Sequence, residues 1–149
     1  MTVWWLGYLA ADKALIDPMV RLCFYNTASA NAFVQWGAIS CFEEDDKPSE
    51  EMRIEYQKRR DYLVDSINKI DKLSCLKPKG AFYVFVNISK TGMDGESFSN
   101  YLLEDYGVAT VPGINFGESG RNFIRMSYAT SYQDIVKAIP RIKKAVEEI

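Results

Sequence analysis

The arrangement of apolar and polar positions divides the chain into helical and extended stretches. After Ser49, apolar residues recur at three-, four- and seven-residue steps as far as Ile70, the spacing of one face of an α-helix. Ser49 is the expected N-cap, and the acidic residues after it suit the positive end of the helix dipole. About 22 residues would give a helix roughly 33 Å long, which suits a connection between two bodies. The apolar stripe comprises Met52, Tyr56, Leu63, Ile67 and Ile70.

The stretch from about Leu73 to the end predicts, in order, a strand, a helix, two strands and a helix. The first strand is rich in β-branched and aromatic residues and is bounded by proline and glycine. Gly107 is expected to end the middle helix, and Thr130 or Ser131 to begin the last one. The expected ranges are 81–88 for the first strand, 97–106 for the middle helix, and 108–111 and 122–129 for the other two strands.

The first stretch, up to about Phe42, is apolar and rich in small residues. Residues 6–11 form a short apolar run that could be a buried strand, and Asp12 is a plausible cap for a helix beginning at Lys13. A second helix is expected near 33–39 and is apolar on most faces, so it has to be buried by other elements. Too little chain precedes this helix to cover it, and we expect it to pack against a further body.

These patterns predict an α/β fold class whose C-terminal part is α+β, with helices packed on a small mixed or antiparallel sheet. They divide the chain into a first segment, 1–42, a long helix within 43–72, and a C-terminal domain, 73–149. With 149 residues, 48% hydrophobic and 26% charged, the chain has the size and composition of an ordinary globular domain that can bury a core.

Charge and residue counts exclude several classes of function. The formal net charge of -2 gives no electrostatic reason to expect a nucleic acid or an anionic membrane as partner. The chain has no histidine, which excludes a Ser-His-Asp triad, a Cys-His pair and a histidine-bearing zinc site. Its three cysteines are far apart and have no metal-binding spacing, so we expect free thiols in a reducing cytoplasm and no metal. No apolar run approaches the ~20 residues of a membrane span, and no targeting segment is evident.

Arg125 is the most informative candidate for chemistry. If Phe123, Arg125 and Ser127 share one face of a strand, a permanent charge projects among apolar neighbours, and it then requires an anionic partner. That partner could be a substrate carboxylate, which an arginine binds through two parallel hydrogen bonds. The residues alone leave two alternatives open, an intrachain ion pair or a strand at the edge of the sheet.

Residues 112–117 form a second candidate feature. This glycine-rich segment leaves a strand, turns sharply and carries an aromatic residue between two glycines, which is a pattern typical of loops that line pockets. On its own it could equally be an ordinary surface turn. The residues concerned are Pro112, Gly113, Phe116 and Gly117.

The order of these elements and motifs resembles the C-terminal part of a class I aminotransferase, a pyridoxal-phosphate enzyme of the aspartate aminotransferase type. The resemblance covers nearly the whole chain, and the motifs are specific in this order and spacing. They are Met1-Thr2-Val3-Trp4-Trp5-Leu6-Gly7-Tyr8, Lys79-Gly80-Ala81-Phe82-Tyr83, Val111-Pro112-Gly113 through Phe116-Gly117, and Ile124-Arg125-Met126-Ser127-Tyr128-Ala129.

The resemblance implies that Arg125 binds the α-carboxylate of the substrate and that residues 112–117 form a pocket wall. It also implies that 1–42 is the end of the cofactor-binding large domain, that the long helix joins the two domains, and that 73–149 is the small domain. The family's Schiff-base lysine would fall just ahead of Met1. Where the family has Gly-Trp-Arg this chain has Val3-Trp4-Trp5, so Trp5 replaces the arginine that contacts the cofactor phosphate.

We therefore expect a cytoplasmic segment of an aminotransferase that supplies the carboxylate site of an enzyme transferring an amino group between an amino acid and a 2-oxo acid. The parent enzyme uses pyridoxal phosphate; alone, this chain is expected to bind none and to be inactive. A homodimer or self-association through residues 1–42 is expected. The alternative is a non-catalytic interaction or regulatory module that keeps the small-domain fold.

Overall fold

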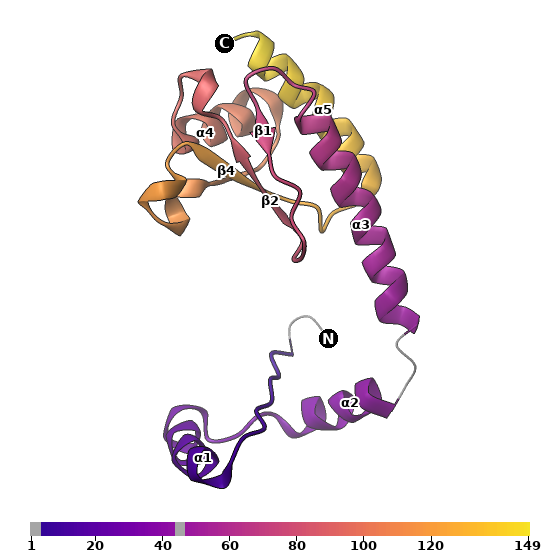
Figure 1. The fold of residues 1–149 in the computed structure, drawn as a ribbon, viewed down its shortest axis with the longest axis vertical. Coiled ribbons are helices and arrows are strands. Elements are labelled where there is room, and N and C mark those ends of the chain that lie inside the picture. The colour runs from indigo at the N-terminus through magenta and orange to yellow at the C-terminus, as the bar shows by residue number, and fades with distance from the viewer. Residues whose placement is uncertain (1–3, 44–46) are drawn as a thin grey trace. The chain divides into compact units, whose positions relative to one another are not determined.

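The computed structural model describes residues 4–43 and 47–149 (Figure 1). The chain divides into two compact units, Met1–Pro48 and Ser49–Ile149. Within the part that the structure describes, every strand belongs to the second unit, and no helix is long and apolar enough to cross a membrane. The two units differ in how much of their apolar surface is buried.

The first unit contains helices α1 (Lys13–Thr27) and α2 (Ala32–Glu43). As predicted, α1 begins after Asp12; the carbonyl of Asp12 accepts the first hydrogen bonds of the helix, but its side chain makes no capping bond. The prediction of a buried strand at residues 6–11 is wrong, because this segment is exposed and unpaired. A strand needs a neighbouring ladder, and no other strand lies within the described part of this unit.

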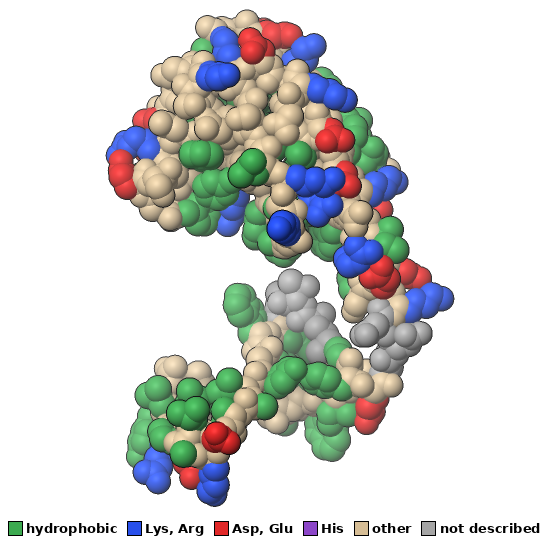
Figure 2. Space-filling model, in the orientation of Figure 1, with side chains coloured by type: hydrophobic (Ala, Val, Ile, Leu, Met, Phe, Trp, Pro, Cys, Tyr) green, Lys and Arg blue, Asp and Glu red, His purple; other side chains and the backbone are tan. Residues whose placement is uncertain are grey.

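Apolar side chains of the first unit lie mostly on its surface. Among its described residues only Val34 is buried. Figure 2 shows hydrophobic side chains over much of the visible face of this unit. Large apolar side chains that stay exposed on helices are typical of surfaces that pack against another protein or another part of a chain. The large exposed residues of the two helices include Leu15, Val20, Leu22, Phe24, Phe33, Trp36 and Phe42.

The long helix predicted after Ser49 is present as α3 (Lys47–Ile67), with 21 residues. Ser49 is not its N-cap, because the helix already begins at Lys47 and so includes Ser49. Only the C-terminal part of the predicted stripe is buried: Leu63 and Ile67 are in the core, whereas Met52 is exposed. The N-terminal turns of α3 extend beyond the sheet, so their apolar side chains have no layer to pack on (Figure 1).

The second unit is built on a four-stranded antiparallel sheet of order β1-β2-β4-β3. Gly107, in the left-handed conformation, ends the helix before β3, and the side chain of Ser131 caps the last helix, both as predicted. Strand β3 is shorter than the predicted range of 108–111. The backbone amide of Val108 donates instead to the carbonyl of Leu102, in the last turns of the preceding helix. The elements are β1 (Ser74–Cys75), β2 (Tyr83–Asn87), α4 (Gly95–Tyr106), β3 (Val111–Pro112), β4 (Phe123–Ser127) and α5 (Tyr132–Glu147).

Helices α3, α4 and α5 form one layer on one face of this sheet (Figure 1). The face is apolar because alternate residues of β2 and β4 point into it, with Val84 and Ile124 almost completely buried. None of the three helices α3, α4 and α5 of the second unit lies over the opposite face. The core residues of the sheet and helices include Leu63, Ile67, Val84, Val86, Phe98, Leu102, Ile124, Met126, Ile135 and Ile142.

Two glycines bring the turns after β3 into backbone contact. A Cβ atom built on Gly113 would lie 2.3 Å from the carbonyl oxygen of Gly120, and one built on Gly120 would lie 2.2 Å from that of Gly113. Atoms of these kinds cannot approach so closely, so any side chain at either position forces the segments apart. The contact joins the 3₁₀ turns Gly113–Phe116 (η2) and Glu118–Gly120 (η3), and thereby fixes the loop that leads back to β4.

Replacing Gly113 by alanine should therefore be costly. We expect Gly113→Ala to lower the free energy of unfolding by about 2–3 kcal/mol, because the new methyl group meets rigid backbone. Gly80→Ala is the matched control: a Cβ atom there meets nothing within 4 Å, and the change should be about 1 kcal/mol or less. Urea denaturation of the three proteins measures the difference. Equal stability of the two variants would contradict the tight loop contact.

Candidate functional site

Arg125 lies on the open face of the sheet. Along β4 the residues Phe123, Arg125 and Ser127 point away from the helices, as the alternation predicts, while Ile124 and Met126 are buried beneath. Arg125 pairs with Phe85 of β2 on one side and with Val111 of β3 on the other. The strand that carries Arg125 is therefore an inner strand, which excludes the edge-strand alternative.

The guanidinium group of Arg125 lies against two aromatic rings. Its central carbon lies 4.2 Å from the ring centre of Tyr83, in β2, and 4.6 Å from that of Phe116, at the end of η2. Both distances are within the range of cation–π attraction. The side chain is half-buried. Neither ring accepts a conventional hydrogen bond from the group, so its N–H donors have no protein acceptor among the described residues.

Among the described residues, no carboxylate and no hydrogen-bond acceptor pairs with Arg125. The alternative of an intrachain ion pair is thus wrong within residues 4–43 and 47–149. Four other arginines of the second unit do have such partners: Arg53 with Glu50, Arg59 with Glu55, Arg60 with Asp61, and Arg121 with Glu118. A permanent charge that is partly desolvated and unpaired is the property expected of a site that binds an anion.

The predicted loop, residues 112–117, contacts Arg125 through one residue. Pro112 pairs with Ile124 in the sheet, Gly113 is buried against Gly120, and Gly117 has a φ of 120° that favours glycine. These three positions set the path of the loop. Phe116 is the member whose ring reaches the guanidinium group.

A groove of about 560 Å³ runs along the same face of the sheet next to Tyr83. Three of the rings that line it, those of Tyr83, Phe85 and Phe123, come from β2 and β4. Cys75 also lines the groove, and burial raises the pKa of its thiol to about 11, so the thiol stays protonated at neutral pH. The residues that line the groove carry no charge at neutral pH, and Arg125 is not one of them.

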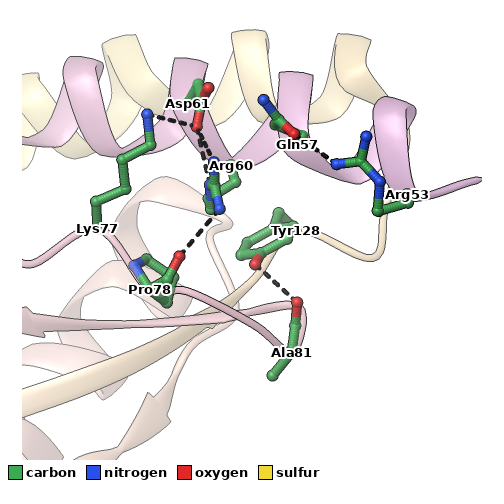
Figure 3. A network of polar contacts seen from close by, with 8 residues as sticks. All are labelled: Arg53, Gln57, Arg60, Asp61, Lys77, Pro78, Ala81 and Tyr128. Atoms are coloured by element: carbon green, nitrogen blue, oxygen red, sulfur yellow. Dashed lines mark hydrogen bonds and ion pairs between the residues drawn. The ribbon is translucent and has the colours of Figure 1, made fainter.

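A polar network holds the segment that leads into Tyr83 (Figure 3). The carboxylate of Asp61 bridges Lys77, at 2.9 Å, and Arg60, at 2.8 Å, and these bonds lower its pKa. Arg60 also donates to the carbonyl of Pro78 at 3.1 Å. These contacts tie the chain before β2 to helix α3.

The hydroxyl of Tyr128 donates to the carbonyl of Ala81 at 2.8 Å (Figure 3). Ala81 has a φ of 60°, a conformation that costs a residue with a Cβ atom about 1–2 kcal/mol and needs support from its surroundings. Tyr128 is itself almost fully buried. This bond helps to set the direction in which the chain enters β2, and so the position of Tyr83.

Sequence reasoning did not identify Tyr83 as a site residue, although it lies in a matching motif. Its alternation with Val84 marks the open face of a strand, but only the register of β2 against β4 shows that this face is shared with Arg125. Trp5, at the position that the resemblance assigns to phosphate binding, is 91% exposed and carries no charge. Val3, beside it, lies outside the described residues.

Comparison with known proteins places these features in one family. The model for "Aminotransferase class I and II" matches residues 1–142. The aspartate aminotransferase of Pyrococcus horikoshii is 42% identical over 99% of this chain, and the aromatic-amino-acid aminotransferase 2 of Thermococcus litoralis is 37% identical over 99% of it. The chain spans 38% of the length of each of these relatives.

Solved structures agree with this match. The crystal structure of the aromatic aminotransferase from Pyrococcus horikoshii has a TM-score of 0.93 and 38% identity, covering 99% of this chain and 40% of its own. The aspartate aminotransferase from Thermus thermophilus with maleate has a TM-score of 0.87 and 33% identity, covering 97% of this chain and 38% of its own.

Proposed function

Since the chain belongs to the class I and II aminotransferase family, we propose that its Ser49–Ile149 unit supplies the substrate α-carboxylate site of a transaminase, with Arg125 as the binding residue. The observation that carries this proposal is the guanidinium group itself, which is half-buried, lies against two rings and has no acidic partner among the described residues. Amino acids and 2-oxo acids share a carboxylate next to the reacting carbon, so one arginine can hold either substrate.

The geometry suits a carboxylate in particular. A guanidinium group presents parallel N–H donors that match the two oxygens of a carboxylate, and the resulting pair of charge-assisted bonds fixes orientation as well as position. Because the surrounding rings exclude water from part of the group, its interaction with an anion is screened less than on an open surface. Arg125 would thus bind and orient the substrate without taking part in bond making.

The family's cofactor, pyridoxal phosphate, does not fit the residues of this chain. Trp5 replaces the arginine expected at the phosphate, and no lysine here matches the Schiff-base position. We therefore assign cofactor binding and proton transfer to other parts of an aminotransferase, with 1–42 as the end of the large domain, the helix within 43–72 as the joint and 73–149 as the small domain. The chain alone is expected to be inactive.

A non-catalytic module with the same fold is the alternative. An interaction module has no need of an unpaired arginine on the open face of its sheet, so the state of Arg125 favours the carboxylate site.

Substitution of Arg125 tests the proposal. Because this side chain has no ion-pair partner to leave uncompensated, Arg125→Ala should change the free energy of unfolding by about 1 kcal/mol or less. In a chimera that joins this chain to the N-terminal part of the Pyrococcus horikoshii aspartate aminotransferase, the same change should lower kcat/KM about 100-fold or more.

Arg121→Ala is the control, since Arg121 is an exposed arginine paired with Glu118 and should leave the kinetics of the chimera unchanged. Unfolding of the chain by Arg125→Ala, together with unaltered kinetics in the chimera, would identify Arg125 as a structural residue.

A cofactor-binding test follows from Trp5 and the missing lysine. We expect the chain mixed with pyridoxal phosphate to form no stoichiometric complex that survives gel filtration, although surface lysines will react weakly. Absorbance spectra report whether a complex forms, and peptide mapping after borohydride reduction identifies any modified lysine. Stable modification of one lysine in every molecule would contradict the expected division of roles.

The apolar surface of the first unit predicts self-association. We expect multi-angle light scattering to find dimers or larger species, because helices α1 and α2 expose large apolar side chains. Deletion of residues 1–42 should give a monomer. As a control, Leu76→Ser changes a residue that is 90% exposed in the second unit and should not alter the molecular mass. If the 149-residue chain stays monomeric at high concentration, this surface is not an interface.

A further inference from the structure

We propose that the rings of Tyr83 and Phe116 form an aromatic clamp whose role is to position the guanidinium group of Arg125 for a carboxylate. Tyr83 and Phe116 are thus positioning residues that act through Arg125. The inference rests on the proposed function, and it adds two specific residues and a physical role for each.

The first argument is the geometry of the clamp. The two rings lie 4.2 Å and 4.6 Å from the central carbon of the guanidinium group and belong to different elements, β2 and η2. Neither ring takes a conventional hydrogen bond from the group, so its N–H donors stay without an acceptor among the described residues. A carboxylate binds through those donors. The clamp therefore restrains the side chain without competing with the ligand.

The second argument is that burial does not explain the ring of Phe116. Phe116 is 51% exposed, whereas Phe98, a core residue, is 0% exposed. The solvent side of an antiparallel sheet normally carries polar residues. Here the open face instead carries a group of aromatic rings with Arg125 among them, and Phe116 also contacts Phe85 at 5.6 Å between ring centres. Because the ring of Phe116 is half exposed to solvent and lies against the guanidinium group, we attribute its role to the contact with that cation.

The third argument concerns what the clamp prevents. Arginine has a long flexible side chain, and ordering it at the moment of binding weakens the complex. Other arginines of this unit turn to carboxylates three, four or one residue away. Contact with the two rings restrains the side chain of Arg125 before a ligand arrives. It also makes lysine a poor substitute, because a point charge has no planar face to be clamped.

The experiment follows the side chain of Arg125 directly. In the ¹⁵N-labelled chain, the Nε–Hε resonance of Arg125, assigned with Arg125→Lys, is recorded while sodium propionate is added, with sodium chloride at equal ionic strength as the reference. We expect the free wild-type resonance to be shifted by the ring currents of the two rings, and to move further on addition of propionate.

Leucine variants remove the π faces but retain apolar bulk. Tyr83→Leu and Phe116→Leu should each abolish part of the ring-current shift and weaken propionate binding about three- to tenfold. Tyr83→Phe and Phe116→Tyr keep the rings and should retain wild-type affinity. Tyr132→Leu is the matched control, because it removes a ring that lies 4.9 Å from the ammonium group of Lys58 and should leave Arg125 unchanged.

The outcomes separate the two proposals. If the wild-type resonance does not move when propionate is added, the proposed function is wrong, and the proposed role of the clamp is wrong as well. Movement that is equally strong in the leucine variants overturns the clamp alone. Loss of folding in both leucine variants, seen as collapse of the amide spectrum, also overturns it, because the rings would then serve the fold.

Discussion

The antiparallel pairing of β2 with β4 is the constraint on which the other features depend. Its register places Phe85 opposite Arg125 and Val86 opposite Ile124. Since side chains alternate between faces, a slip of one residue would drive Arg125 into the core and bring Ile124 to the open face. The apolar residues buried between the sheet and the helices therefore also determine that Arg125 lies on the opposite face. The same strand register accounts for the core and for the position of the site.

Much of this arrangement can be predicted from the sequence, and the limits have physical reasons. Local signals succeeded where local chemistry decides: Gly107 ends a helix, Ser131 caps one, and the alternation around Arg125 gives its face. They failed at residues 6–11, where an apolar run without a neighbouring strand stays unpaired, and at Ser49, which lies inside a helix that begins earlier.

The surroundings of Arg125 could not be predicted from the sequence, because they come from three separate parts of the chain. The ring of Tyr83 arrives through the pairing of β2 with β4, and that of Phe116 through a turn held by the contact of Gly113 with Gly120. Neither the strand pairing nor the contact between the two glycines can be predicted from the residues next to Arg125. The glycine-rich loop could be recognised from its composition. Which of its residues contacts the guanidinium group of Arg125 depends on the backbone contact between Gly113 and Gly120.

The two units also differ in whether they can hold a binding site at fixed geometry. The second unit has a closed core, so its sheet can hold Arg125 and two rings at fixed distances, which a binding site requires. The first unit buries few of its described apolar residues and offers a surface instead. An arginine in a half-buried position is tolerated without an acidic partner only if other interactions offset part of its lost hydration. The rings provide that offset, while the N–H donors of the group have no acceptor among the described residues and are therefore available to a carboxylate.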